Sequence, residues 1–342
     1  MQIQGQWNNR SGATMQYEAL AAGEALGMSF TARLAGNGGL TPDSLRLRLF
    51  RNDPEGGMLG PMQATQIALR DVETLRGGLT GQGTYGRGVF ISNQPLARGA
   101  RFGLTSLRGT LPAGWDAELY RNGELRAFQA DRGDGRYQFD DIELLFGEND
   151  FEVVLYGPQG QIKRERSSMP VGQDNVTPGQ TQYWAGVLDS HRDLIDLSRT
   201  FVSPQTGWRW GVGVERGIDR RTTLGLEYQS LMLGGRRRHY LEATLRRGVG
   251  PMLLELAGAR QLGGGRALRV DALGRLGPVR FDAQVLWVKG DFESELVRAQ
   301  QRREYSLRLN STLHLGNWRL PVEGAVRQTL TRDGTRVTDW LG

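Results

Sequence analysis

The sequence contains no cysteine and no long apolar segment. Without cysteine, the chain has no disulfide framework and no thiolate metal site. Its uninterrupted apolar runs are only a few residues long, such as Met252 to Leu254, whereas a membrane-spanning helix requires about 20 apolar residues. The segment Met1-Gln2-Ile3-Gln4 has neither the basic residues nor the apolar stretch of an export signal. These absences exclude disulfide-stapled folds and helical membrane proteins.

Positive charge is in slight excess but is dispersed along the chain. The 43 Lys and Arg residues outnumber the 37 Asp and Glu residues, which gives a formal net charge of +6. The arginines recur at alternate positions within predicted strands and are not gathered into one basic tract. We therefore expect no binding to nucleic acid.

Strict alternation of apolar and polar residues dominates the chain from about Gly207 onward. In the segment 303–315, Tyr305 and Leu307 fall on one face and Glu304 and Arg308 on the other. Glycine-rich turns such as Gly234-Gly235 separate such segments. The pattern predicts an up-and-down antiparallel meander, with about six strands in the first hundred residues and about eight or nine after residue 181.

Strand length and aromatic placement favour a transmembrane β-barrel of the Gram-negative outer membrane. The segments approach the ~9–11 residues that a tilted membrane strand needs, and Trp and Tyr lie near their ends, where interfacial girdles form. The polar face would then line a water-filled lumen, although a soluble sandwich would turn the same residues to solvent. The lumen candidates are Arg209, Glu227, Glu242, Arg269, Asp271, Arg280, Asp282 and Arg308.

The middle of the chain differs, because its predicted strands are short and joined by tight turns. Asn122-Gly123 between two strand patterns is a strong hairpin signal. We expect a small β-sandwich, Ig-like or transthyretin-like, over residues 104–173. The predicted domains are the first barrel strands in 1–103, this inserted sandwich, and further barrel strands in 181–342, with hinge linkers near residues 95–103 and 172–180.

The segments 111–123 and 135–142 resemble the middle, or plug, domain of outer-membrane fimbrial ushers. The resemblance implies a pore that secretes and assembles surface fibre subunits delivered by a periplasmic chaperone, with the inserted domain closing the resting channel. The N-terminal and C-terminal domains of that family are not found here, so we expect either an internal fragment or a related group with another partner. The residues that carry the resemblance are Trp115, Tyr120, Asn122, Gly123, Gly135, Tyr137, Phe139 and Asp141.

The sequence indicates neither an enzyme nor a cofactor. Ser311 falls on the opposite strand face from Asn310 and His314, so these residues cannot form a triad on one strand. The three histidines are far apart, and no metal site is predicted. Expected partners are outer-membrane lipid or lipopolysaccharide and chaperone–subunit complexes. Arg236-Arg237-Arg238 fit either contact with lipopolysaccharide phosphates or solvated loop charge. Two alternatives stay open: a transport or adhesion barrel whose small domain binds a ligand, and a soluble carbohydrate-binding β-protein.

Overall fold

The computed structural model describes residues 2–8, 12–37, 42, 44–74, 77–96, 104–112, 114–131, 135–143, 149–168, 176–192, 195–196, 207–315 and 318–341. Within these ranges the chain is built from β-strands, and its one helical element is the short 3-10 turn η1 (Gly60–Met62). No helix of the described ranges is long and apolar enough to cross a membrane. The predicted all-β class is confirmed.

One large antiparallel sheet contains most of the strands. Its strands before residue 93 are β1 (Gln2–Asn8), β2 (Gly12–Ala25), β3 (Met28–Asn37), β4 (Ser44–Asn52), β5 (Gln66–Glu73) and β6 (Tyr85–Ser92). Its later strands are β13 (Thr181–Ser190), β14 (Ile195–Asp196), β15 (Gly207–Asp219), β16 (Thr222–Leu233), β17 (Arg236–Val249), β18 (Met252–Gln261), β19 (Arg266–Leu276), β20 (Val279–Lys289), β21 (Gln301–Leu315), β22 (Trp318–Thr331) and β23 (Arg336–Leu341).

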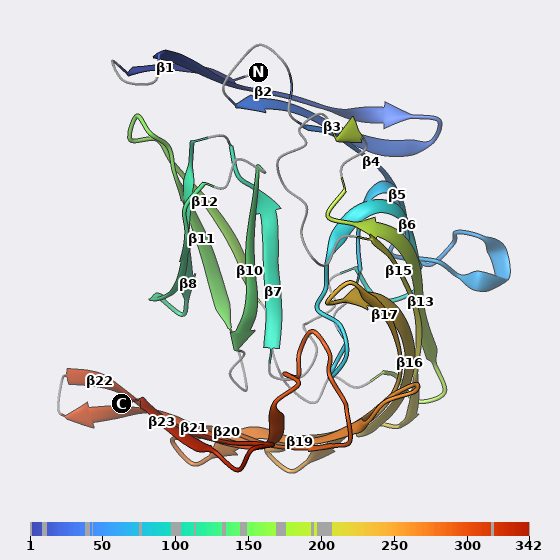
Figure 1. Cartoon of the computed structure of the whole chain (residues 1–342), viewed down its shortest axis with the longest axis vertical. Coiled ribbons are helices and arrows are strands. Elements are labelled where there is room, and N and C mark those ends of the chain that lie inside the picture. The colour runs from blue at the N-terminus through green and yellow to red at the C-terminus, as the bar shows by residue number, and fades with distance from the viewer. Residues whose placement is uncertain are drawn as a thin grey trace.

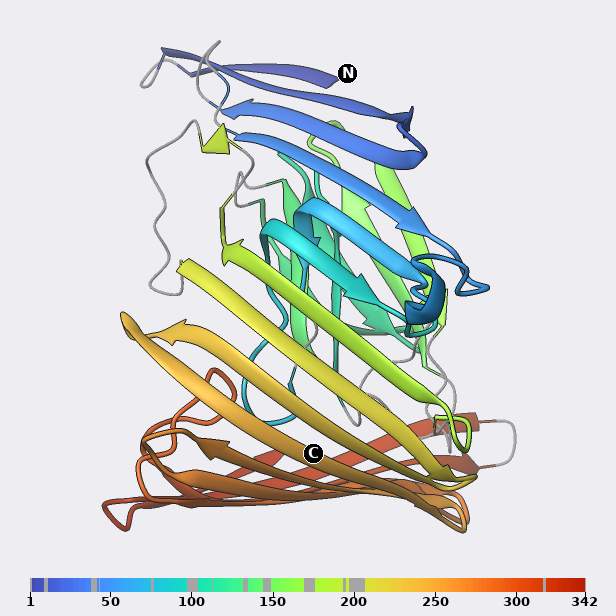
Figure 2. The same ribbon diagram turned by 90° about the vertical axis from the view of Figure 1, so that its right-hand side faces the viewer.

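The large sheet is a meander, as the alternation predicts. Successive strands pair with each other, β6 pairs with β13 across the intervening segment, and the two-residue strand β14 pairs with β4. The predicted Gly234-Gly235 turn joins β16 to β17, with φ values of 56° and 74° that suit a tight two-residue hairpin. The strands run obliquely across the molecule in Figure 2.

The large sheet is strongly curved but does not close into a barrel, a point that the sequence pattern left open. In Figure 1, β1 lies at one end of the curve and β23 at the other. Among the described residues, β1 pairs only with β2 and β23 only with β22. The diameter of a barrel grows with its number of strands. Because the large sheet curves around the two-layer segment between β6 and β13, its strands are too few to complete the circumference.

Between β6 and β13 the chain forms two small sheets, which we call the inserted sheets. They lie within the curve of the large sheet (Figure 1). One pairs β7 (Leu104–Thr110) with β10 (Arg136–Glu143), and the other has the order β12-β11-β8-β9. The strands of the second sheet are β8 (Asp116–Arg121), β9 (Glu124–Gln129), β11 (Asp150–Tyr156) and β12 (Ile162–Ser168).

A hydrophobic core joins the two inserted sheets. Trp115, Leu119, Phe139 and Phe151 are buried in it. Burial of such side chains stabilises a fold by roughly 1.5–3 kcal/mol each, so the inserted sheets have a core of their own. The Ig-like or transthyretin-like class and the domain boundaries stay predictions, since residues 97–103 and 169–175, which include most of the expected linkers, lie outside the described residues.

Two of the strands, β7 and β23, lack a regular alternation of apolar and polar residues. β7 contains Ser106, Arg108 and Gly109, which give it no apolar alternation. In β23 the large apolar residues Val337 and Trp340 are three positions apart, which breaks the period of two. Pairing with another strand defines each of them: β7 pairs with the distant β10, and β23 pairs with the neighbouring β22.

Candidate functional site

The two faces of the large sheet differ sharply in chemistry. On β15, Trp208, Trp210 and Val212 are 54%, 42% and 48% exposed, whereas Arg209 between them is 5% exposed. The same alternation continues through the later strands. Further exposed apolar side chains are Val214, Leu224, Leu226, Leu241, Leu245, Leu256, Leu268, Trp287, Tyr305, Leu307, Leu309, Leu320 and Val322. The outer face is therefore an apolar band.

The eight candidates for a lumen lining all lie on the opposite, inner face of this sheet. Arg209, Glu227, Glu242, Arg269 and Asp271 are buried there. Arg280, Asp282 and Arg308 are half-buried on the same face, and Arg308 is the cross-strand neighbour of Asp282. Charged residues that would be solvated on an open sheet are thus covered, and the covering group is a segment of the same chain.

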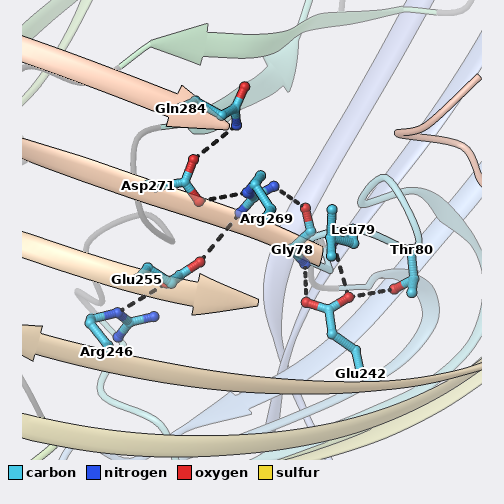
Figure 3. Close-up of polar contacts among 9 residues, drawn as sticks. All are labelled: Gly78, Leu79, Thr80, Glu242, Arg246, Glu255, Arg269, Asp271 and Gln284. Atoms are coloured by element: carbon cyan, nitrogen blue, oxygen red, sulfur yellow. Dashed lines mark hydrogen bonds and ion pairs between the residues drawn. The ribbon is translucent and has the colours of Figure 1, made fainter. Parts of the chain in front are cut away.

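The loop of residues 77–84, between β5 and β6, bonds to three of these residues, Arg209, Glu242 and Arg269, and we call it the inner loop. Glu242 on β17 binds the inner loop (Figure 3). Its carboxylate accepts hydrogen bonds from the Gly78 N–H at 2.9 Å, the Leu79 N–H at 3.0 Å and the Thr80 hydroxyl at 3.1 Å. Arg269 donates to the Gly78 carbonyl oxygen. Three donors on one carboxylate form a strong, charge-assisted anchor.

Arg269 is also held on the inner face by a carboxylate of its own strand and one of the neighbouring strand β18. It lies 2.6 Å from Asp271 and 3.3 Å from Glu255, and Glu255 lies 3.3 Å from Arg246 (Figure 3). Gln284 donates to the second oxygen of Asp271 at 2.9 Å. Each charge of this network therefore has an opposite charge or a hydrogen-bond partner, as burial requires.

A second anchor lies farther along the inner loop. Arg209 on β15 donates to the Gln82 carbonyl at 2.6 Å and pairs with Glu295, which accepts from the Gln82 N–H at 2.8 Å. Ser294 donates to the Leu79 carbonyl at 2.7 Å. The segment 290–297, between β20 and β21, thus holds the inner loop from a second side.

Glycine allows the inner loop to lie flat on the sheet. A Cβ at Gly78 would be 2.4 Å from Oε1 of Glu242, and one at Gly81 would be 2.2 Å from Oε1 of Gln229. Sequence reasoning missed this loop. The available signal was the run of glycines at 77, 78, 81 and 83 between two strands, which is typical of a close backbone approach.

The inserted sheets touch the large sheet through a few polar contacts. Arg136 on β10 forms a 2.5 Å ion pair with Asp71 on β5 and stacks over Tyr85 at 3.9 Å. Arg126 on β9 lies 3.2 Å from Glu323 on β22. Arg108 on β7 donates to the carbonyl of Gly83 in the inner loop.

Apolar contact between the inserted sheets and the large sheet is small by comparison. Leu253 on β18 and Leu273 on β19 are the large-sheet members of the core cluster of the inserted sheets. The contact therefore combines polar pairs with a small apolar part.

The predicted plug-motif residues have structural roles within the inserted sheets. Trp115, Tyr137 and Phe139 are buried in the core. Asn122 and Gly123, with φ of 52° and 84°, form the predicted hairpin turn between β8 and β9. Gly135, at φ 64°, lies against the guanidinium of Arg33, where a Cβ would be 1.6 Å from its Nη2. Asp141 belongs to β10, but its side chain lies outside the described residues.

Two tyrosines of the motif bind carboxylates. Tyr120 donates to Glu118 at 2.7 Å, and this hydrogen bond, with some burial, raises the pKa of Tyr120 to about 12. Tyr137 donates to Glu165 on β12 at 2.8 Å, and burial together with this bond raises the pKa of Tyr137. Both phenols therefore remain neutral donors, and the second one ties the two inserted sheets together.

Comparison with known proteins gives distant structural likenesses. No family model and no curated protein matches the sequence. The P pilus usher PapC translocation pore aligns at 13% identity with a TM-score of 0.47, over 99% of this chain and 71% of that one. An E. coli P pilus tip assembly intermediate, PapC-PapD-PapK-PapG, aligns at 11% identity and 0.44, over 99% and 48%. A porin variant of Rh. blastica aligns at 11% identity and 0.37, over 96% and 88%. Likenesses this distant assign no family, so the function is argued from this chain.

Proposed function

We propose that this chain forms the wall of an outer-membrane pore and that the inserted sheets close its bore. The observation that carries the proposal is the position of the inserted sheets within the curve of a sheet that is apolar outside and charged inside. An apolar band on the outer face suits lipid, and an interior lined by charge suits water. A folded body in that interior would block the passage of solutes.

The substrate class that we propose is a folded protein subunit, delivered by a periplasmic chaperone and assembled into a surface fibre. An opening wide enough to contain the two-layer inserted sheets is wide enough for a folded domain of similar size. The resemblance of residues 111–123 and 135–142 to the middle domain of fimbrial ushers supports the same substrate. Lipid and lipopolysaccharide would contact the outer face.

Opening would be a rigid-body displacement of the inserted sheets. Their own core holds them together as they move. The contacts that they leave behind include the pairs Arg136–Asp71 and Arg126–Glu323, the Arg108 bond to Gly83, and packing on Leu253 and Leu273. Hydrogen bonds between charged groups contribute about 1.5–3 kcal/mol each, so a few such pairs hold the closed position and still allow it to be reversible. The inner loop is held by more contacts and would stay in place.

The open edges of the sheet set a requirement on this proposal. Backbone groups along β1 and β23 cannot remain unpaired in hydrocarbon. The pore therefore requires these edges to pair with each other or with further strands. Migration on a gel that changes on boiling, after folding into lipid, would be the signature of such a closed barrel.

Conductance in planar bilayers tests the gating role. Full-length protein is expected to give a small current, and a variant lacking residues 104–173 is expected to give a large, steady one. Equal currents from both proteins would overturn the closing role and favour the alternative, in which the inserted sheets bind a ligand away from the bore. An aqueous monomer that needs no detergent would overturn the pore itself.

A further inference from the structure

A cavity of 220 Å³ lies between the inserted sheets and the part of the large sheet formed by β2–β5. Its lining is unusually rich in arginine, with guanidinium groups contributed from both sides. The arginines that line it are Arg33 on β3, Arg46 and Arg48 on β4, Arg108 on β7 and Arg136 on β10. Two carboxylates, Asp71 and Glu73, line the same cavity.

Two of these arginines are direct cross-strand neighbours. Arg33 on β3 is paired in register with Arg46 on β4, and both are only 6% exposed. Like charges placed directly opposite each other destabilise a sheet, and burial increases their repulsion because the local dielectric constant falls. Such a pair needs negative charge nearby.

Among the described residues, carboxylates lie in ion-pair range of three of these arginines. Arg33 lies 2.5 Å from Glu18, Arg108 lies 3.0 Å from Asp140, and Arg136 is paired with Asp71. Arg48 differs from these three. Within the described part of the chain it has no carboxylate in ion-pair range, and its main contact is the face of Phe50 at 5.2 Å.

The Nε atoms of Arg48 and Arg108 are also buried without a hydrogen-bond partner among the described residues. A buried donor left unsatisfied costs about 1–3 kcal/mol. Both side chains line the cavity, one from the large sheet and one from the inserted sheets. The cavity therefore presents positive charge and unused donors to whatever occupies it.

We propose that this cavity binds a small oxyanion of the phosphate class. A tetrahedral oxyanion accepts several N–H···O bonds at once, and the planar guanidinium group donates two parallel bonds to it. The volume of 220 Å³ exceeds the ~30 Å³ share of one water molecule several-fold, which leaves room for one such anion with water. Bound there, it bridges Arg48 of the large sheet and Arg108 of the inserted sheets.

Isothermal titration of the full chain, folded in neutral detergent, with inorganic phosphate tests the site. We expect one phosphate per chain and an affinity at least about tenfold weaker in Arg48→Gln, equivalent to about 1.4 kcal/mol. The matched control is Arg51→Gln, which changes an exposed arginine of the same strand and is expected to leave the affinity within about twofold. Constant ionic strength removes general screening effects.

A parallel titration with a short-chain lipid monophosphate identifies the source of the anion. Binding of inorganic phosphate assigns the site to a free oxyanion, and binding of the lipid alone assigns it to a headgroup. No binding of either probe, or an equal loss in Arg48→Gln and Arg51→Gln, overturns the proposal. Arg48→Gln removes no carboxylate partner, and a circular dichroism spectrum equal to that of the unchanged protein confirms its folding. The titration measures phosphate affinity and not conductance, so its outcome does not depend on the proposed pore function.

Discussion

The guanidinium of Arg136 on β10 lies 2.5 Å from the carboxylate of Asp71 on β5, and this ion pair joins the inserted sheets to the large sheet. Burial by itself lowers the pKa of Arg136, but the Asp71 carboxylate and its hydrogen bond raise it by more, so the net pKa lies above the ordinary value. The Arg136 guanidinium therefore keeps its charge, and loss of the pair is expected to weaken the hold on the inserted sheets.

Asp71→Asn is expected to release the inserted sheets more often. Without its counter-charge Arg136 loses a charge-assisted bond worth about 2 kcal/mol, and 1.4 kcal/mol corresponds to a tenfold shift in population. Single-channel recording should show open events at least about tenfold more frequent. Glu152→Gln is the control, because Glu152 pairs with Arg164 and Arg166 at an exposed edge of the inserted sheets. Identical records for both variants would contradict a latch at Asp71.

Glu242→Ala is expected to detach the inner loop. The carboxylate accepts from Gly78, Leu79 and Thr80, and no other residue of the described chain is shown bonding all three. Chymotrypsin should then cut after Leu79, at a rate at least about tenfold above the unchanged protein, since local opening controls such cleavage. Glu24→Ala, an exposed change on β2, should leave the cleavage pattern alone. A loop that stays protected in Glu242→Ala would show that the second anchor at Arg209 is sufficient.

The strands and their faces could be predicted from sequence where they depend only on residues that are close together in the chain. On β15 and β21 the alternation fixes which side chains share a face, because successive side chains of a strand point to opposite sides. The Asn122-Gly123 turn is likewise local, because these residues tolerate positive φ. The same locality explains why the eight inner-face candidates fall on one side of the sheet.

The anchoring of the inner loop could not be predicted in this way. Gly78 and Glu242 are 164 positions apart, and their contact depends on the curvature that brings β17 beneath the loop. The open edge of the sheet is also a property of the whole curve, since closure depends on strand number, tilt and stagger together. The alternation of apolar and polar residues along a strand gives no information on strand number, tilt or stagger.

Gly78→Ala is expected to destabilise the protein, because its Cβ would stand 2.4 Å from Oε1 of Glu242. Forcing an atom into a packed site costs roughly 1–3 kcal/mol. Gly324→Ala on β22 is the matched control, since a Cβ there meets nothing within 4 Å, and alanine favours a regular strand over glycine by roughly 0.5–1 kcal/mol. Urea midpoints in detergent should therefore move in opposite directions. A fall in both would mean that steric contact with Glu242 is not the cause.

Leu226→Arg tests whether the outer face meets lipid. Leu226 is 50% exposed near the middle of β16, so arginine fits there without a clash if the surrounding medium is water. In a membrane, an arginine on the lipid face costs about 2–4 kcal/mol at the midplane. We expect the folded fraction in lipid vesicles, read by migration before and after boiling, to fall about tenfold or more.

The control for this change is Leu26→Arg, because Leu26 lies fully exposed in the turn between β2 and β3. Arginine at a turn remains hydrated whether or not the strands cross a membrane, so folding should be unchanged. If Leu226→Arg folds as well as Leu26→Arg in vesicles, the exposed leucines and tryptophans of β15 and β16 do not face hydrocarbon. The apolar band would then have to meet another protein surface, because water alone does not favour so large an exposed apolar area.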